Sequence, residues 1–373
     1  MQLPNGWKKV KLGKIGRVSS GSTPLRSQKN FYENGTIPWV KTMDLNNKDI
    51  KFTDEKITTL AAQKCKPYPS QTLLVAMYGG FNQIGRTGIL TFPASINQAL
   101  AALSFNEKEV YAKYVQHYLN ANVEKWKTFA ASSRKDPNIT SHDVENFEIL
   151  LPPLAEQKKI AESLSVWDSA IEKMEKLIEC KEKIHAKLLN DCMHCADWKI
   201  SSIESVATVK KGIQLNGENM ISNGSYYVMN GGVVPSGYTD EWNTPENTVS
   251  ISEGGNSCGF VAFNDEKFWA GGHCYTLIDV SPEVLPKFLF HYLKNKEKEI
   301  MKLRVGSGLP NIQKDSITNF EFKYPTKKEQ KNIVEILDSS QKELSLLKQQ
   351  LALYKKQKQG LMQKLLTGEW RVK

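Results

Sequence analysis

Two short motifs place reactive residue types at spacings that have a chemical interpretation. Cys192-Met-His-Cys195 brings two thiols and an imidazole together, which is the spacing of half a zinc site. The sequence offers no second ligand pair at a suitable distance. The six cysteines, at positions 65, 180, 192, 195, 258 and 274, are scattered in the manner of reduced intracellular thiols. We therefore expect no metal site and no disulfide framework.

The segment from Gly80 to Thr87 (GFNQIGRT) comes within one residue of the phosphate-binding loop GxxxxGK[ST]. Arg86 replaces the lysine that would contact phosphate, and Gly-Ile-Leu follows in place of a helix. The Asn/Asp-Pro-Pro-aromatic motif of adenine methyltransferases is also missing, because the only Pro-Pro pair, at 152–153, lies between two leucines. The sequence therefore predicts a chain that is not an enzyme and needs no cofactor.

Amides and cations in the turns are the residue types left for chemistry, and they suit contacts with DNA. Asn and Gln can form two hydrogen bonds with adenine, Arg can do so with guanine, and phosphate contacts fix the register. We expect such contacts on loops that a rigid scaffold holds. Each candidate also has a simpler interpretation as a solvated surface residue, and we expect fewer than half to touch DNA. The candidates are Ser22, Thr23, Arg26, Lys29, Lys41, Asn82, Gln83, Arg86, Arg134, Lys135, Lys210, Lys211, Asn230, Asn256, Arg304 and Lys314.

The charge of the chain favours an acidic partner, although unevenly. A formal net charge of +10 and a pI of about 9.1 are typical of proteins that bind nucleic acid. Residues 1–150 hold 20 Lys and Arg against 12 Asp and Glu, and residues 326–373 hold 11 against 5. Residues 151–197 and 198–325 each carry a net charge of −2. Bulk charge therefore does not predict DNA contact along the whole chain.

Hydropathy gives no sign of a membrane protein. No apolar run approaches 18 residues, and the first residues contain no apolar stretch of the signal-peptide type. We expect a cytoplasmic protein without a membrane partner.

The sequence repeats itself once, with an offset near 173 residues after the first segment. The matching segments keep their order, which chance does not produce. The final Gly368-Glu-Trp370 also resembles Asn5-Gly-Trp7, so we expect the two termini to lie close together. The clearest matches are Gly79-Gly80 with Gly254-Gly255, His117-Tyr-Leu with His291-Tyr-Leu, and Glu156-Gln-Lys with Glu329-Gln-Lys.

Each copy ends in a long stretch whose apolar residues follow steps of four and three. The rhythm persists for about four to five heptads, from Leu154 to about Leu189 and again from 326 to 365, and it indicates a coiled coil. Because a whole domain connects the two helices, antiparallel pairing is natural. Polar residues take the skipped seam positions, namely Lys181, His185, Ser340 and Lys358. The predicted seam comprises Ile160, Leu164, Trp167, Ile171, Met174, Ile178, Leu188, Ile333, Leu337, Leu344, Leu347, Leu351, Tyr354, Leu361 and Leu365.

These patterns predict an α+β fold: two mixed β-rich domains separated by a long antiparallel two-helix coiled coil, with a pseudo-two-fold internal repeat. Short apolar strands such as Thr72–Met77 and Thr248–Ile251 alternate with Gly, Asn and Ser turns. A helical stretch follows each set, at Val110–Phe129 and Val284–Leu303. The expected domains are residues 1–150, 151–197, 198–325 and 326–373, of which the second and fourth are the long helices.

In this arrangement the chain resembles the specificity subunit of type I restriction-modification systems, over essentially its whole length. The resemblance rests on a Trp-Lys start, a Gly-rich turn, Leu151-Pro-Pro-Leu-Ala-Glu-Gln leading into a long helix, and the closing Met362–Trp370 segment. The second copy of this motif differs, because Lys323-Tyr-Pro-Thr-Lys stands where the first copy has Leu151-Pro-Pro-Leu-Ala. The resemblance implies two target recognition domains that bind a bipartite, asymmetric site in double-stranded DNA.

The same resemblance implies protein partners. Two methyltransferase subunits would bind each chain, and restriction/translocase subunits would join the full complex. We expect the methyltransferase subunits to dock on the outer faces of the helices and near the helix starts, at Glu156, Gln157, Glu329 and Gln330.

Other functions remain as alternatives. The chain is also compatible with a specificity subunit of another phage-defence or type II modification system, or with a coiled-coil scaffold that has no DNA role. An autonomous methyltransferase is disfavoured by the missing motif. The target bases are not predicted, because one sequence offers no code for them.

Overall fold

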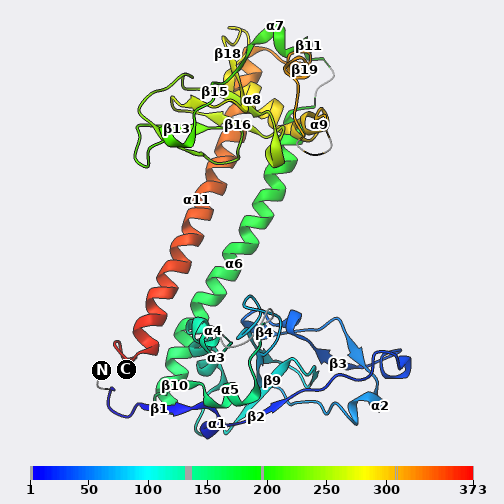
Figure 1. Cartoon of the computed structure of the whole chain (residues 1–373), viewed down its shortest axis with the longest axis vertical. Coiled ribbons are helices and arrows are strands. Elements are labelled where there is room, and N and C mark those ends of the chain that lie inside the picture. The colour runs from blue at the N-terminus through cyan, green and yellow to red at the C-terminus, as the bar shows by residue number, and fades with distance from the viewer. Residues whose placement is uncertain (1–2, 131–136, 195–196, 307, 309, 373) are drawn as a thin grey trace. The chain divides into compact units, whose positions relative to one another are not determined.

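The computed structural model describes residues 3–130, 137–194, 197–306, 308 and 310–372. The chain divides into two compact units: unit 1 comprises Met1–Met174 and Gln350–Lys373, and unit 2 comprises Glu175–Gln349. Helices α6 (Leu154–Cys192) and α11 (Lys327–Leu366) each begin in one unit and end in the other (Figure 1). Because this division cuts both helices, the domain boundaries drawn from the sequence stay predictions.

Unit 1 is built on a five-stranded sheet with the strand order β2-β9-β6-β7-β4. Its neighbouring strands are antiparallel except for β7 and β4, which are parallel. Two smaller sheets, β5-β3-β8 and β1-β10, accompany it. The strands are β1 (Lys8–Lys11), β2 (Gly16–Ser20), β3 (Ile37–Val40), β4 (Lys48–Ile50), β5 (Lys56–Ile57), β6 (Leu73–Ala76), β7 (Thr87–Leu90), β8 (Ser95–Ile96), β9 (Leu100–Phe105) and β10 (Glu148–Leu151).

Unit 2 repeats this plan with one strand fewer in the main sheet, whose order is β12-β18-β15-β16. The small sheets recur as β14-β13-β17 and β11-β19, and the central strand of the three-stranded sheet again has one antiparallel and one parallel neighbour. The strands are β11 (Lys199–Ser202), β12 (Thr208–Lys211), β13 (Tyr226–Met229), β14 (Gly237–Thr239), β15 (Thr248–Ser252), β16 (Val261–Asn264), β17 (Trp269–Ala270), β18 (Cys274–Ile278) and β19 (Glu321–Tyr324).

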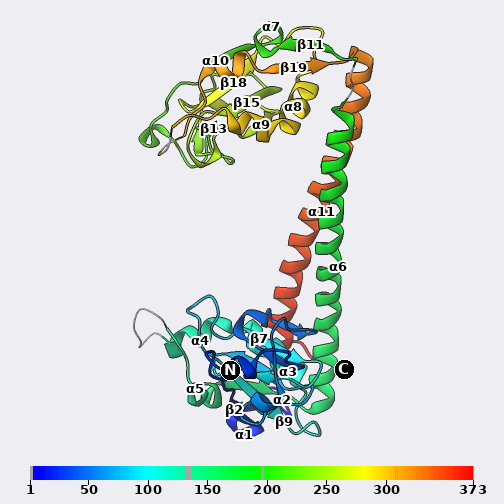
Figure 2. The same cartoon turned by 90° about the vertical axis from the view of Figure 1, so that its right-hand side faces the viewer.

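Strand β6 shows why the central strands are apolar throughout. Its side chains alternate between the two faces of the sheet, and both faces are covered. Leu73 and Val75 belong to the core that includes α3 (Ala112–Ala121), whereas Leu74 and Ala76 belong to a second core on the side of β3 and β8. In unit 2, α8 (Pro286–Asn295) covers β15 and β16 in the position that corresponds to α3 (Figure 2).

The two helical stretches predicted after the strands are each broken in the structure. Residues 112–130 form α3 and α4 (Val123–Ala130), which are separated at Asn122. In unit 2, Lys296 separates α8 from α9 (Glu297–Lys302), and its ψ of 6° leaves the helical range. The remaining short helices are α1 (Leu12–Ile15), α2 (Thr59–Ala62), α5 (Ser141–Asn146), α7 (Ile203–Val206) and α10 (Lys314–Thr318).

One buried glutamine at the start of each long helix ties that helix to the domain before it. Gln157 accepts a hydrogen bond from the Tyr111 amide (2.8 Å) and donates to the carbonyl oxygens of Glu109 (3.0 Å) and Pro152 (2.8 Å). Gln330 repeats the pattern with the Leu285 amide and the carbonyl oxygens of Glu283 and Pro325. Both glutamines are fully buried, so neither is available to a partner, and the expectation that they contact a methyltransferase subunit is wrong.

The two long helices are antiparallel wherever one unit contains both of them, as predicted. In unit 1 the ring of Trp167 lies 5.8 Å from that of Tyr354, and Glu156 near the start of α6 pairs with Arg371 beyond the end of α11. In unit 2, His185 lies 3.0 Å from the Ser340 hydroxyl. All of the predicted seam residues are buried or half-buried.

The polar residues at the skipped seam positions contact one another or nearby acids across the helix pair. His185 faces Ser340 in unit 2, where Lys181 also pairs with Glu343 at 2.7 Å. In unit 1, Lys358 pairs with Asp168 at 2.5 Å. Since a polar group at a seam position is satisfied only in the correct alignment, these pairs favour one register of the helices.

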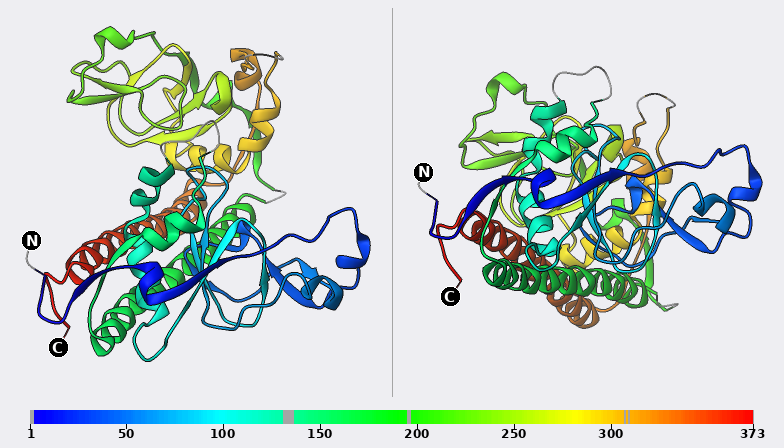
Figure 3. Two further views of the ribbon diagram at one scale, coloured as in Figure 1. Left: turned by 60° about the horizontal axis from the view of Figure 1, so that its bottom comes forward. Right: turned by 90° about the horizontal axis from the view of Figure 1, so that it is seen from below.

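Both chain ends that the structure describes lie side by side in unit 1 (Figure 3). The Arg371 guanidinium donates to both carboxylate oxygens of Glu156 and reaches the Asn5 carbonyl oxygen at 3.4 Å. Trp7 also donates its ring N–H to Glu156. The expected closeness of the termini is therefore present within this unit.

Among the residues that the structure describes, no helix is both long enough and apolar enough to cross a membrane.

Candidate nucleic-acid interface

In unit 2, three of the predicted residues gather where the strands of the main sheet and the small sheet end. Lys211 is the last residue of β12, Asn230 follows β13, and Asn256 lies in the turn that follows β15. The turn is held by Ser257, whose hydroxyl donates to the Gly231 carbonyl oxygen at 2.5 Å. The polar side chains of several strand ends therefore meet at one edge of the unit.

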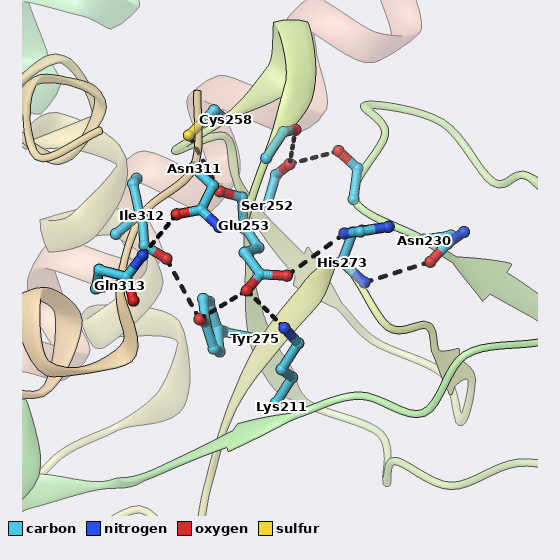
Figure 4. A network of polar contacts seen from close by, with 12 residues as sticks. Lys211, Asn230, Ser252, Glu253, Cys258, His273, Tyr275, Asn311, Ile312 and Gln313 are labelled. Carbon is cyan, nitrogen blue, oxygen red and sulfur yellow. Dashed lines mark hydrogen bonds and ion pairs between the residues drawn. The ribbon is translucent and has the colours of Figure 1, made fainter. Parts of the chain in front are cut away.

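A buried carboxylate organises this edge, as Figure 4 shows. Glu253 is 5% exposed and accepts hydrogen bonds from Lys211 Nζ (2.6 Å) and the Tyr275 hydroxyl (3.0 Å). His273 Nδ1 lies 3.4 Å from its other oxygen. Burial by itself would raise the pKa of Glu253, but the hydrogen bonds from Lys211 and Tyr275 outweigh it and hold the pKa below its ordinary value. We call Lys211, Glu253, His273 and Tyr275 the Glu253 cluster.

Two further candidates of unit 2, Arg304 and Lys314, are close in sequence to residues beside this turn. Asn311 pairs through its backbone with both Gly254 and Val305, which places Val305, the residue after Arg304, beside the turn that follows Glu253. Burial raises the pKa of the Cys258 thiol, and the Arg304 charge opposes that shift. Lys314 is exposed at the start of α10.

Lys210 lies outside this cluster. Neighbouring residues of a strand point to opposite faces, so its side chain leaves β12 on the face opposite to that of Lys211.

In unit 1, an acidic residue again holds two of the predicted cations. Arg26 donates to Glu55 at 2.8 Å, and Lys41 donates to the same carboxylate. Burial would raise the pKa of Glu55, but these two hydrogen bonds lower it below the ordinary value. The Arg26 guanidinium also lies over the rings of Tyr32 (4.7 Å) and Trp39 (4.8 Å). Arg26 is therefore fixed in place on an aromatic surface.

The turn between β6 and β7 carries Asn82, Gln83 and Arg86. It leads into a strand, as the sequence indicates, and not into the helix that a phosphate-binding loop requires. Asn82 is exposed, and Arg86 is half-buried. Among the described residues, the side-chain oxygen of Gln83 is buried without a hydrogen-bond partner. Gly85, with φ of +77°, packs so closely on Trp126 that a Cβ atom would lie 2.1 Å from the indole ring.

The other candidates of unit 1 are less connected. Ser22 lines a hollow of about 420 Å³ together with Arg17, Lys64 and Lys66, which the sequence did not single out. Thr23 is exposed, and Lys29 pairs only loosely with Glu33 at 3.8 Å. Arg134 and Lys135 lie outside the described residues, as does Cys195 of the CxxC motif. Within the described part of the chain, no group of three or more His, Cys, Asp and Glu is placed to hold a metal ion.

Sequence reasoning missed Glu253, His273 and Tyr275. His273 follows Gly271-Gly272, and a glycine pair before a histidine at a predicted turn could have marked it. Glu253 directly precedes Gly254-Gly255, but a single acid in a basic protein gives no signal of burial. Their proximity depends on the pairing of β15 with β18, which only the fold reveals.

Comparisons with known proteins bear on the whole chain. A family model described as the type I restriction modification DNA specificity domain matches residues 4–182 and 196–353. A Methanocaldococcus jannaschii protein named as the type I restriction enzyme MjaVIII specificity subunit is 22% identical over 426 residues, covering 100% of this chain and 95% of that protein.

Shorter matches are more similar in sequence. A Mycoplasma genitalium protein named as a type I specificity subunit is 34% identical over 139 residues, which are 37% of this chain. The chain covers only 36% of that relative and 32% of a Mycoplasma pneumoniae relative.

A solved structure shares the fold. The crystal structure of a type I restriction-modification system S subunit from M. genitalium has a TM-score of 0.70 and 18% identity, and the match covers 98% of both chains. Together with the repeated topology, the family match leads to one conclusion. The chain belongs to the type I restriction modification DNA specificity domain family and contains that domain twice.

Proposed function

We propose that this chain is a DNA-binding specificity subunit that recognises a two-part, asymmetric sequence in double-stranded DNA, one part through each unit. The observation that carries this proposal is the repetition of one backbone framework with different side chains at its strand ends. A shared framework would present both units to the duplex in the same manner. Different side chains would select different bases, which makes the two parts of the site unequal.

Equivalent backbone hydrogen bonds support the shared framework. The Ile139 amide donates to the Met77 carbonyl oxygen at 2.9 Å in unit 1, and the Ile312 amide donates to that of Glu253 at 2.8 Å in unit 2. Gly21 and Gly212 are also equivalent, because each lies at the end of its strand where a Cβ atom would meet a carbonyl oxygen at 2.3 Å. Ser22 and Thr23 directly follow Gly21, Lys211 directly precedes Gly212, and Asn256 lies three residues after Glu253.

We further propose that two methyltransferase subunits dock on the helices of each chain and that restriction subunits join the complete assembly. Exposed aliphatic side chains on the helices support this docking. Leu177 and Ile184, seven residues apart on α6, are 42% and 46% exposed, and Ile336 and Leu346 on α11 are 49% and 55% exposed. Because residues seven apart share one face of a helix, Leu177 and Ile184 lie on one face of α6. Exposed apolar side chains grouped on one face are typical of protein interfaces. On this proposal the chain itself performs no methyl transfer.

The test is reconstitution of the full chain with its methyltransferase, followed by mass measurement and gel shift on duplex DNA. We expect two methyltransferase subunits per chain and a sequence-dependent shift. Ile184→Glu should reduce methyltransferase binding at least tenfold, because it places a charge in an apolar contact. Ala186→Glu, also exposed on α6 but on the face opposite to Ile184, serves as the matched control. A single methyltransferase per chain, or methyl transfer by the purified chain, would contradict the proposal.

A coiled-coil scaffold without a DNA role makes a different prediction for the same experiment. Such a scaffold would still bind partner proteins and would remain sensitive to Ile184→Glu. It would show no sequence-dependent shift of DNA at physiological salt.

A further inference from the structure

The Glu253 cluster occupies a position that has an exact structural counterpart in unit 1. The Glu253 amide donates to the His273 carbonyl oxygen at 2.9 Å, and the Met77 amide donates to that of Ala99 at 2.8 Å. Glu253 therefore corresponds to Met77, and His273 corresponds to Ala99.

The other two members follow from strand register. Lys211 is paired with Tyr275 between β12 and β18, and Ser20 is paired with Ala101 between β2 and β9. The four polar members of the Glu253 cluster are thus replaced in unit 1 by Ser20, Met77, Ala99 and Ala101, while the backbone hydrogen bonds remain.

This replacement shows that the fold does not need the cluster. Met77 is 3% exposed and packs in the core of unit 1, so an apolar side chain fills the same place. A buried ion pair rarely stabilises a protein more than well-packed apolar residues of similar size. The carboxylate of Glu253 must therefore have another role, and what it holds in place is the pair of outward-facing side chains, Lys211 and His273.

His273 is presented to the surrounding solvent in a fixed orientation. Its side chain is 64% exposed, although Nδ1 faces the buried carboxylate. The Asn230 side-chain oxygen accepts a hydrogen bond from the His273 backbone amide at 3.4 Å, which anchors the loop that carries it. Figure 4 shows the second ring nitrogen on the side away from Glu253.

We propose that His273 reads a base in the part of the DNA site that unit 2 recognises, with Glu253 as the residue that positions it. This inference rests on the proposed DNA-binding function and assigns a specificity-determining residue to it. The Nε2 atom can accept a hydrogen bond from the amino group of adenine or cytosine, or donate one to N7 or O6 of guanine. Lys211, held by the same carboxylate, is placed to contact the adjoining phosphate.

Selection of bound duplexes from a random double-stranded DNA library tests the assignment, using the full chain with its methyltransferase. We expect the wild type to select a two-part motif. His273→Ala should remove the preference at one or two neighbouring positions of one half, leave the other half unchanged, and weaken binding to the original site by roughly ten- to a hundredfold. Glu253→Gln, which keeps the size of the side chain, should weaken the preference at the same positions.

His194→Ala provides a matched control, because His194 is another exposed histidine of unit 2 and lies two residues beyond the end of α6, outside the cluster. It should select the wild-type motif. An unchanged motif for His273→Ala would overturn the assignment while leaving the proposed function intact, and so would a uniform loss of affinity at all positions, which indicates a phosphate contact. A wild type that selects no motif would overturn the proposed function and the assignment together.

Discussion

Gln157 and Gln330 illustrate how a single side chain fixes the junction between a domain and a helix. Each saturates one amide and two carbonyl oxygens that the chain would otherwise bury without partners. A buried polar group without a hydrogen bond is costly, so these glutamines determine where the helix attaches. This structural role explains the glutamine in each of the matching Glu-Gln-Lys segments of the sequence.

We predict that Gln157→Leu destabilises unit 1 by about 1–3 kcal/mol, because it leaves the Tyr111 amide and two carbonyl oxygens unpaired. Hydrogen exchange should show faster exchange of the Tyr111 amide, and urea denaturation should show the loss of free energy of unfolding. Gln357→Leu on the exposed face of α11 is the control and should change stability by less than about 0.5 kcal/mol. Unaltered protection of the Tyr111 amide would count against this role.

His117 gives unit 1 a pH-dependent stability. Burial lowers its pKa to about 4, and the nearby Asp168 opposes that shift only in part. The unfolded chain, with a histidine pKa near ~6.5, takes up a proton between pH 6.5 and 4 that the folded unit does not bind. Stability should therefore fall as the pH falls through this window.

Between pH 7.5 and 5.0 the free energy of unfolding should fall by about 2 kcal/mol because of His117. Denaturation at both pH values should show that His117→Gln loses that much of the wild-type pH dependence. His142→Gln, whose side chain is 81% exposed, should retain it. Equal pH dependence in wild type and His117→Gln would refute the assignment.

For single residues, the sequence predicted the types of the candidate contact residues better than it predicted their roles. Amides and cations in turns were identified, and Lys211, Asn230 and Asn256 do gather at one edge. His273 and Glu253 were missed because their significance comes from strand pairing between residues about twenty positions apart. Arg26 and Lys41 were identified as cations, but their shared partner Glu55 depends on the tertiary fold.

At the scale of elements, the long helices were predicted well because their 3.5-residue apolar period is local and extends over many turns. The helix breaks at Asn122 and Lys296 were not predicted, because the apolar pattern continues through both residues. Neither glycine nor proline marks the end of the first helix in either pair. The order of strands in the sheets could not be predicted from the sequence either, because the pairing of β2 with β9 joins residues more than eighty positions apart.

The continuity of α6 and α11 leads to a prediction about the spacing of the DNA site. Inserting four residues after Glu175 in α6 and four after Gln349 in α11 adds ~6 Å of rise and about 40° of rotation. On B-DNA these changes correspond to roughly two base pairs of rise and one of twist. The unspecific spacer should therefore lengthen by one or two base pairs, with both recognised halves unchanged.

Methylation-site mapping of this variant measures the spacer directly. Inserting the same four residues after Gly217, a position with open space around it, is the control and should leave the spacer unchanged. A constant spacer in the helix variant, or altered bases in either half, would show that the helices do not set the distance.

At the scale of the whole chain, repetition is the property that the sequence revealed most fully. The offset of the matching segments predicted two domains of one topology, and the structure repeats every strand pairing of unit 1 in unit 2 except that of β4 with β7. The Gly-Glu-Trp segment near the C-terminus resembles the start of the chain, and this resemblance predicted neighbouring termini. Within unit 1, the ion pair of Arg371 with Glu156 holds the C-terminal segment in place. The target bases were not predictable, because the units differ in side chains whose partners lie on another molecule.

On the proposed function, the two units recognise two different short sequences in one DNA site. Genome-wide mapping of methylated bases, in cells that contain this chain and its methyltransferase, measures this recognition. We expect a motif of two unequal specific parts separated by a fixed unspecific spacer, with one part lost when residues 1–150 are exchanged for those of a relative. A single continuous motif, two identical halves, or methylation independent of sequence would contradict it.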